Sequence, residues 1–131
     1  MALQNFLDRQ APVVSAAWLN AVDRIKDTWL GTTAAETAAG VVPTAPWFPP
    51  ADIRRYGAVG DGVTNDSAAI NTALSSNDYI LIPDPITAWR LNSTISVPDN
   101  KGLIGYGLAS QLLKGFNGGM FSLGRNSYLD N

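Results

Sequence analysis

The chain has 131 residues, 46% of them hydrophobic, and nine Lys and Arg against eleven Asp and Glu give a formal net charge of −2. It contains neither cysteine nor histidine, which excludes disulfides, thiolate nucleophiles, Cys- or His-bound metals and a Ser-His-Asp triad. Nothing in this charge balance attracts nucleic acid, and no apolar run approaches the roughly 20 residues of a membrane-spanning helix. We therefore expect no nucleic-acid partner and no membrane insertion.

Residues 1–31 predict one amphipathic helix. Ser15 has the position of an N-cap and Gly31 that of a C-terminal stop. Between them, apolar residues recur at steps of four, three and four, which places them on one helix face. Such a stripe either packs on its own domain or associates with other copies of the helix, and both interpretations stay open. If it forms an interface, the contact residues are Trp18, Leu19, Val22, Ile25 and Trp29.

Residues 32–50 predict a linker. The small, polar stretch Thr32–Gly40 fits either a weak helix or a flexible spacer. Val41–Pro50 contains four prolines, which remove backbone donors and favour extended geometry. We expect an extended connector there, anchored by Trp47 and Phe48, although a proline-rich ligand for another domain is an alternative. A domain boundary is expected near Ala51.

The next stretch predicts a strand, a loop and a short helix. Asp52–Gly57 has the composition of a short strand, and the glycines of Gly57–Asp66 indicate a tight loop. A helix is expected to begin at Asp66 or Ser67, with N–H groups that Thr64, Asn65 and Asp66 can cap. Its apolar face would consist of Ala69, Ile70, Ala73 and Leu74.

Short apolar runs separated by Pro, Asn, Asp or Gly predict strands after Asn77. Their even spacing, without intervening helices, is typical of a sandwich, a barrel or a coiled β-solenoid. The pattern is still running at Asn131, and a solenoid ending there would have unpaired strand edges, so we expect these residues to be the front of a longer polypeptide. The predicted strands are Tyr79–Ile82, Ile86–Leu91, Thr94–Val97, Gly102–Tyr106, Gln111–Lys114 and Met120–Leu123.

The passage from Ala51 to about Leu113 resembles the opening of the pectate-lyase-like right-handed β-helix superfamily. The resemblance rests on Gly57-Ala58-Val59-Gly60-Asp61-Gly62, on the Ala-Ala-Ile helix that follows, and on Tyr79-Ile80-Leu81-Ile82-Pro83. It implies a mainly β fold behind an N-terminal α-helix, with residues 51–131 forming the first coils of a right-handed parallel β-helix in a trimer. The residues that define the loop are Gly57, Gly60, Asp61, Gly62 and Asp66.

The N-terminus resembles a second family. Phe6-Leu7-Asp8-Arg9, Pro12 and the run Ser15–Asp23 are similar to the particle-binding leader of tailspikes and tail fibres from short-tailed bacteriophages. This resemblance implies a homotrimer that is made in the host cytoplasm, resides in the virion and binds adaptor or nozzle proteins of the phage tail. It also implies that a downstream region binds host surface polysaccharide.

The sequence supports no metal or cofactor site. A calcium loop opening at Asp61 would have Val63, Asp66 and Thr72 at its third, sixth and twelfth positions, which lacks the glycine and glutamate that such a loop needs. Helix capping accounts better for these polar side chains. The glycines at 57, 60 and 62 have no Rossmann spacing, and no P-loop lysine follows them.

No catalytic residue is assigned. Glycoside cleavage needs two carboxylates, but Glu36 is the only glutamate and lies in the expected linker. The remaining candidates fall in expected turns, where Asp is common for backbone reasons; they are Asp78, Asp84, Asp99 and Asp130. We therefore expect the N-terminal part of a phage tailspike that anchors a polysaccharide-recognising β-helix. The alternative is the front part of a glycoside hydrolase or lyase whose catalytic carboxylates lie downstream; a free lyase would need an export signal, which we do not expect in residues 1–9.

Overall fold

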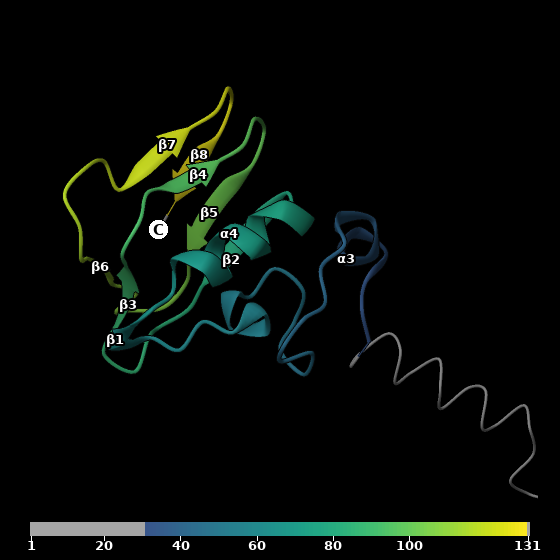
Figure 1. Ribbon diagram of the computed structural model, residues 1–131, viewed down its shortest axis with the longest axis horizontal. Coiled ribbons are helices and arrows are strands. Elements are labelled where there is room, and N and C mark those ends of the chain that lie inside the picture. Colours follow the sequence, from purple (N-terminus) through teal and green to yellow (C-terminus); the bar gives the residue numbers. More distant parts are fainter. Residues whose placement is uncertain (1–30, 131) are drawn as a thin grey trace, which may run out of the picture. The chain divides into compact units, whose positions relative to one another are not determined.

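The computed structural model describes residues 31–130, of which Thr32 onward belongs to one compact unit. The amphipathic helix expected before Gly31 lies outside the described residues. Two α-helices, one 3₁₀ helix and eight short strands follow one another along the described part of the chain (Figure 1). In order they are α3 (Ala34–Ala39), η1 (Ile53–Tyr56), β1 (Asp61–Asn65), α4 (Ser67–Ser76), β2 (Tyr79–Ile82), β3 (Ala88–Leu91), β4 (Ile95–Val97), β5 (Gly102–Gly105), β6 (Leu112–Lys114), β7 (Phe121–Leu123) and β8 (Tyr128–Asp130).

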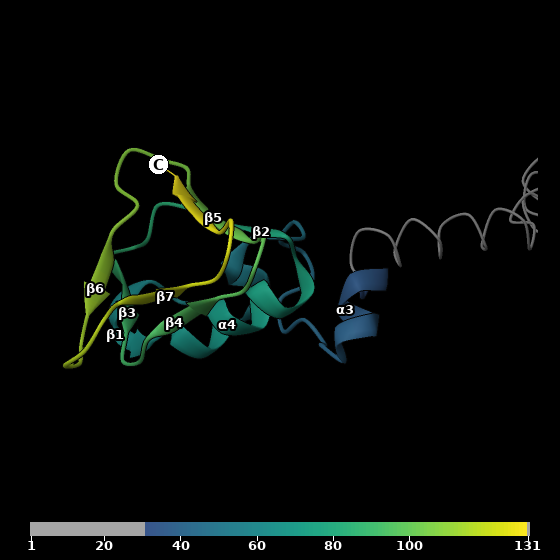
Figure 2. The same cartoon turned by 90° about the horizontal axis from the view of Figure 1, so that it is seen from above.

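The strands form three small sheets in which every pairing is parallel. Their orders are β1-β3-β6, β2-β5-β8 and β4-β7. In Figure 2, β1, β3 and β6 follow one another at one side, β4 and β7 run beside α4, and β2 and β5 lie on the remaining side. Each strand therefore pairs with one from the next passage of the chain instead of with its sequence neighbour.

One apolar core joins the three sheets to helix α4. Buried and less buried residues alternate along β2 and β4 because successive side chains point to opposite faces of a sheet. Ile80, Trp89, Ile95 and Leu103 are each at most 3% exposed. Helix α4 closes the core with four buried side chains: Ala69, Ile70, Ala73 and Leu74.

The expected fold class is wrong. A mainly β chain that starts a right-handed parallel β-helix was expected, but the described residues form a small mixed α/β fold. Their sheets have only two or three strands, and strands of three to five residues bury too little apolar surface to complete a core without other elements. Helix α4 and the 3₁₀ helix η1 supply the missing apolar surface, since their side chains Ile53, Ile70 and Leu74 are at most 1% exposed.

Two local predictions are also corrected. Within Asp52–Gly57, where a strand was expected, Ile53–Tyr56 form the helix η1, because the Asp52 side chain caps the Arg54 N–H and Gly57 ends the turn with φ +94°. Asp61–Asn65, expected within a loop, is the strand β1, because Asp61 and Asn65 pair with Ala88 and Arg90 of β3. Strand β8 was not predicted. Its residues pair with β5, which a single stretch of sequence does not reveal.

The helix predicted from Asp66 or Ser67 is confirmed as α4, together with its apolar face. Only part of its predicted capping is found. The Asn65 side chain accepts the Ser67 N–H at 3.1 Å, whereas Asp66 makes no side-chain cap and Thr64 donates its hydroxyl to Asp61. Six predicted strands are found as β2 to β7, with ends up to two residues shorter. Of the two alternatives for Thr32–Gly40, the structure shows a helix, α3, with a complete capping box between Thr33 and Glu36.

Candidate functional site

The glycines of the predicted loop act through backbone geometry. Gly57, Gly60 and Gly62 all have positive φ, a region that other residues enter only at a cost. Gly60 is also in close contact with the core, because a Cβ there would lie 2.7 Å from the ring of Trp89. A Cβ at Gly62 would lie 3.3 Å from Thr87. The three glycines thus let the chain turn, and Gly60 lets it pass close to the buried Trp89.

The two loop aspartates have different surroundings. Asp66 is 1% exposed, and its carboxylate accepts the backbone N–H groups of Val59 at 2.8 Å and Arg90 at 3.0 Å. It therefore joins the loop to strand β3. Asp61 is at the surface, where hydrogen bonds from the Thr64 and Val63 backbone lower its pKa. Both carboxylates hold loop and strand backbone instead of capping helix α4, so the capping expected of Asp66 is wrong.

A buried ionic cluster, which the sequence analysis missed, lies between α3 and η1. Glu36 and Arg55 are 0% and 1% exposed. Glu36 Oε1 accepts Arg55 Nε at 2.6 Å and the Tyr56 hydroxyl at 2.7 Å, while Oε2 accepts Arg55 Nη2 at 3.0 Å and the Thr33 N–H at 2.7 Å. Arg55 Nη1 also donates to the carbonyl oxygens of Pro46 and Phe48 at 2.6 Å and 3.0 Å. The glutamate expected in a linker is therefore a core residue.

The protonation of this cluster follows from its contacts. Burial by itself raises the pKa of Glu36, but hydrogen bonds from Arg55, Thr33 and Tyr56, together with the charge of Arg55, lower it to about 2. The same hydrogen bond raises the pKa of Arg55 in spite of its burial. Burial also raises the pKa of Tyr56. Glu36 and Arg55 thus stay charged and paired at neutral pH, which suits a structural clamp better than an acid–base catalyst.

The turn aspartates bind backbone in the next passage of the chain. Asp84 accepts the N–H groups of Leu108 and Ala109, and Asp99 accepts that of Arg125 at 2.7 Å.

Within residues 31–130, no group of three or more His, Cys, Asp or Glu side chains is arranged to hold a metal ion. Over the same residues, no helix has both the length and the apolar character needed to cross a membrane.

An uncovered apolar layer ends the described fold at β6, β7 and β8. We use this name for Leu112, Phe121, Leu123 and Leu129. Each pairs in register with a buried core residue: Leu112 with Trp89, Phe121 with Ile95, Leu123 with Val97, and Leu129 with Leu103. The core residues are at most 3% exposed, whereas Leu123 and Leu129 are 54% and 47% exposed. The layer therefore repeats the composition of the core, and its leucines of β7 and β8 stay about half exposed in the part of the chain that the structure describes.

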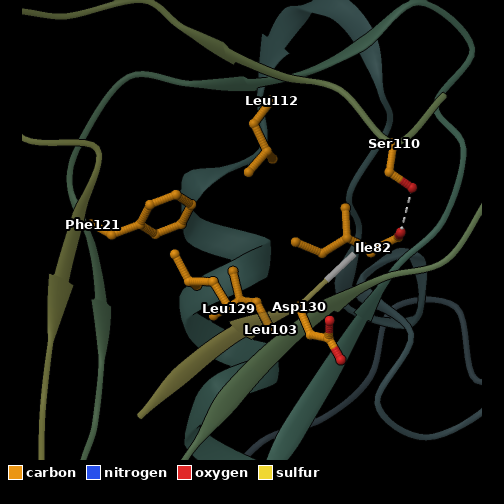
Figure 3. A pocket seen from close by; sticks show the side chains of 8 residues that line it. Ile82, Leu103, Ser110, Leu112, Phe121, Leu129 and Asp130 are labelled. Carbon is orange, nitrogen blue, oxygen red and sulfur yellow. Dashed lines mark hydrogen bonds between the residues drawn. The ribbon is translucent and has the colours of Figure 1, made fainter.

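A hollow of about 170 Å³ opens within this layer. Figure 3 shows Leu112, Phe121 and Ile82 pointing into it from different sides, and Leu103 and Leu129 also line it. Its polar lining comes from Asp130 at the rim and from Ser110, whose hydroxyl donates to the Ile82 carbonyl at 2.9 Å. The hollow is thus an apolar recess continuous with the core.

The structure describes the predicted loop residues, whereas the predicted interface residues lie outside the described part of the chain. Gly57, Gly60, Asp61, Gly62 and Asp66 lie in one stretch around Trp89 and β3. The proposed contact residues lie outside the described residues; they are Trp18, Leu19, Val22, Ile25 and Trp29.

Comparisons with known proteins give one short match. The fungal protein described as "Non-secreted LysM effector LysM19", from Penicillium expansum, is 36% identical to this chain over 56 residues. The match covers 41% of this chain and 4% of that protein, so this chain spans only a small part of the relative's length. No family model matches the chain, and no solved structure matches it. These findings do not place the chain in a family.

Proposed function

We propose that this chain is the N-terminal part of a bacteriophage tailspike, which attaches a homotrimeric, host-polysaccharide-recognising protein to the tail of the virion. The order of three sequence features supports the proposal: the leader-like residues 6–23, the proline-rich residues 41–50 and the glycine-rich motif that begins at Gly57. In this assembly, the apolar stripe of Trp18 to Trp29 contacts its copies and the adaptor or nozzle proteins of the tail. Aromatic anchors of this kind often dominate the energy of an interface.

The structural observation that supports an assembly role most directly is the uncovered apolar layer. Leu123 and Leu129 are about half exposed, although their register partners Val97 and Leu103 are buried. Covering apolar surface contributes roughly 25 cal/mol per Å², so this end of the fold gains free energy when another surface packs on it. An exposed apolar patch with a built-in recess is typical of a surface that joins a larger assembly.

The oligomeric state tests the proposal. Multi-angle light scattering of the full chain is expected to give three times the 13.9 kDa of one chain. The double variant Trp18→Ala/Trp29→Ala is expected to give single chains, whereas the matched variant Trp47→Ala, which removes an exposed tryptophan of the described residues, leaves the mass unchanged. A wild-type chain that stays monomeric across the concentration range would contradict the proposal.

The location in the virion needs a separate measurement. Gold-labelled antibodies against the chain are expected to mark the tail of phage particles from infected cells when these are viewed by negative-stain electron microscopy. Labelling of the capsid alone, or particles without label, would contradict attachment at the tail whatever the oligomeric state.

A further inference from the structure

The outer face of the sheet β2-β5-β8 carries aromatic side chains. Ile80 and Leu103 pair with each other and are buried, so their strand neighbours Tyr79 and Gly102 face outward. Tyr128 of β8 is aligned with Gly102 and therefore lies on the same face. Tyr79 and Tyr128 are 48% and 44% exposed. Tyrosine rings thus flank a glycine across the three strands.

Tyr128 lies directly on the backbone of Gly102. A Cβ built on Gly102 would fall among the Cζ, Cε1 and Cε2 atoms of the Tyr128 ring. The glycine therefore provides the space in which the ring rests against the sheet, while 44% of the tyrosine remains exposed. A ring held in this way presents a fixed aromatic surface, which loses little conformational entropy when a ligand stacks on it.

Polar groups lie at the other end of the same face. Tyr106 follows β5 and continues the outward alternation from Gly102, four residues or about 13 Å along the strand. The Tyr106 hydroxyl lies 3.3 Å from Asp52 Oδ2 and 3.4 Å from Arg54 Nη2. Tyr106 is 44% exposed, and the Arg54 side chain 34%. A guanidinium donor and a phenol oxygen, whose own proton is donated to Asp52, are thus accessible at one edge of the aromatic face.

The arginine at this edge is held rigidly and is already ion-paired. Arg54 donates to both carboxylate oxygens of the buried Asp52, with Nη2 at 2.6 Å from Oδ2 and Nε at 3.0 Å from Oδ1. Its Cζ atom lies 4.4 Å from the centre of the Phe48 ring. The Phe48 ring in turn lies 6.2 Å from that of Trp47, which is 66% exposed. The pairing with Asp52 neutralises the charge, so this edge favours hydroxyl ligands over anions.

We propose that this face, formed by Tyr79, Tyr128, Tyr106 and Arg54, binds an uncharged oligosaccharide. The apolar C–H faces of sugar rings stack on Tyr128 and Tyr79, while sugar hydroxyls accept hydrogen bonds from Arg54 and donate to the hydroxyl oxygen of Tyr106, whose own proton is held by Asp52. The separation of about 13 Å between the two ends requires a ligand of more than one sugar ring. Leu81 and Ile104, which pair on this face between its two ends, are only partly exposed, whereas the more exposed aliphatic side chains that would suit a protein partner lie in the uncovered apolar layer. This inference rests on the proposed function for its polysaccharide partner, but it places binding within residues 31–130.

Saturation-transfer-difference NMR of the full chain tests the site, with cellohexaose, maltohexaose and isomaltohexaose as uncharged probes and hexagalacturonate as a charged probe. We expect saturation transfer to at least one uncharged hexaose. Tyr128→Ala is expected to weaken its binding about fivefold, while Tyr128→Phe, which keeps the ring, binds as the wild type does. Leu113→Ala, which truncates an exposed side chain of the sheet β1-β3-β6, is the matched control and leaves binding unchanged.

Absence of transfer to all three uncharged hexaoses, equal binding by Tyr128→Ala, or tighter binding of hexagalacturonate would overturn the proposal. Circular dichroism establishes that Tyr128→Ala is folded, and light scattering on the same sample separates the two proposals. Hexaose binding by a monomeric chain would contradict the trimeric assembly and support this site. A trimer that binds no hexaose would support the trimeric assembly and contradict this binding site. A trimer that dissociates in Tyr128→Ala would identify the face as a contact between chains and would also contradict the site.

Discussion

Glu36 Oε1 accepts a hydrogen bond from Arg55 Nε at 2.6 Å, although the two residues are 19 positions apart in the chain. Both carboxylate oxygens are satisfied twice, and Arg55 also holds the carbonyl oxygens of Pro46 and Phe48. The cluster thereby joins α3 and the proline-rich stretch to the η1 turn. Because a buried charge without its partner is costly, the position of residues 33–48 depends on this pair.

The buried ion pair of Glu36 and Arg55 predicts that the chain loses stability in acid. Glu36 has a pKa of about 2 in the folded chain against an ordinary value of 4.5. A lowered folded pKa contributes stability that is complete above the unfolded pKa and is lost as the pH falls from about 4.5 toward 2. We expect the free energy of unfolding to fall by about 3 kcal/mol over that window through Glu36.

Urea denaturation at a series of pH values measures this loss. In Glu36→Gln the contribution of residue 36 to the pH dependence should disappear, and the variant should be less stable at pH 7 by about 3 kcal/mol, because Arg55 keeps its charge. The exposed Asp78→Asn is the control and should keep the wild-type profile. A wild-type profile in Glu36→Gln would show that Glu36 is not paired in solution.

Two glycines with similar backbone angles should respond differently to alanine. Gly60 has φ +71° and Gly40 has φ +68°, but an added Cβ meets the Trp89 ring at 2.7 Å only in Gly60 and meets nothing within 4 Å in Gly40. Gly40→Ala should cost about 1 kcal/mol from backbone strain. Gly60→Ala should cost about 3 kcal/mol, because a steric clash in the core is added. Equal losses in urea denaturation would contradict the close approach of Gly60 and Trp89.

The two loop aspartates form a second matched pair. Asp66→Ala should lower the free energy of unfolding by about 2–3 kcal/mol, because the N–H groups of Val59 and Arg90 lose their acceptor. Asp61→Ala should have a smaller effect, since its partners Val63 and Thr64 are exposed and water can replace the carboxylate. Thermal unfolding followed by circular dichroism gives both values, and a larger loss in Asp61→Ala would reverse the assignment.

The uncovered apolar layer can be examined by truncating register partners. Leu103→Ala should destabilise the chain by about 3 kcal/mol, because it opens a cavity in the core. Leu129→Ala, in the next strand, should cost less than about 1 kcal/mol in single chains, since half of its side chain is already in water. A loss in Leu129→Ala as large as in Leu103→Ala would show that another surface covers the layer in solution.

Local sequence patterns predicted the helices and strands whose buried residues follow a simple spacing along the chain. Helical spacing alone marks the buried face of α4, which consists of Ala69, Ile70, Ala73 and Leu74. Short apolar runs bounded by Pro, Asn, Asp or Gly identified β2 through β7. The glycines at 57, 60 and 62 likewise indicated tight turns, because positive φ restricts the choice of residue. These features depend on neighbours a few residues away, which a sequence displays directly.

Tertiary contacts decided the rest. Asp52–Tyr56 has the apolar and aromatic residues of a strand, but the Asp52 cap and the burial of Arg55 beside Glu36 favour a 3₁₀ turn. Strand β1 exists because β3 pairs with it, and Glu36 is a core residue because Arg55 meets it across 19 positions. The fold class was missed for the same reason: spacing predicted the short strands and helix α4 one by one, whereas the packing of α4 and η1 against the sheets depends on contacts between distant residues. Pairing energies over such separations leave no periodic trace in the sequence, so only the folded chain reveals them.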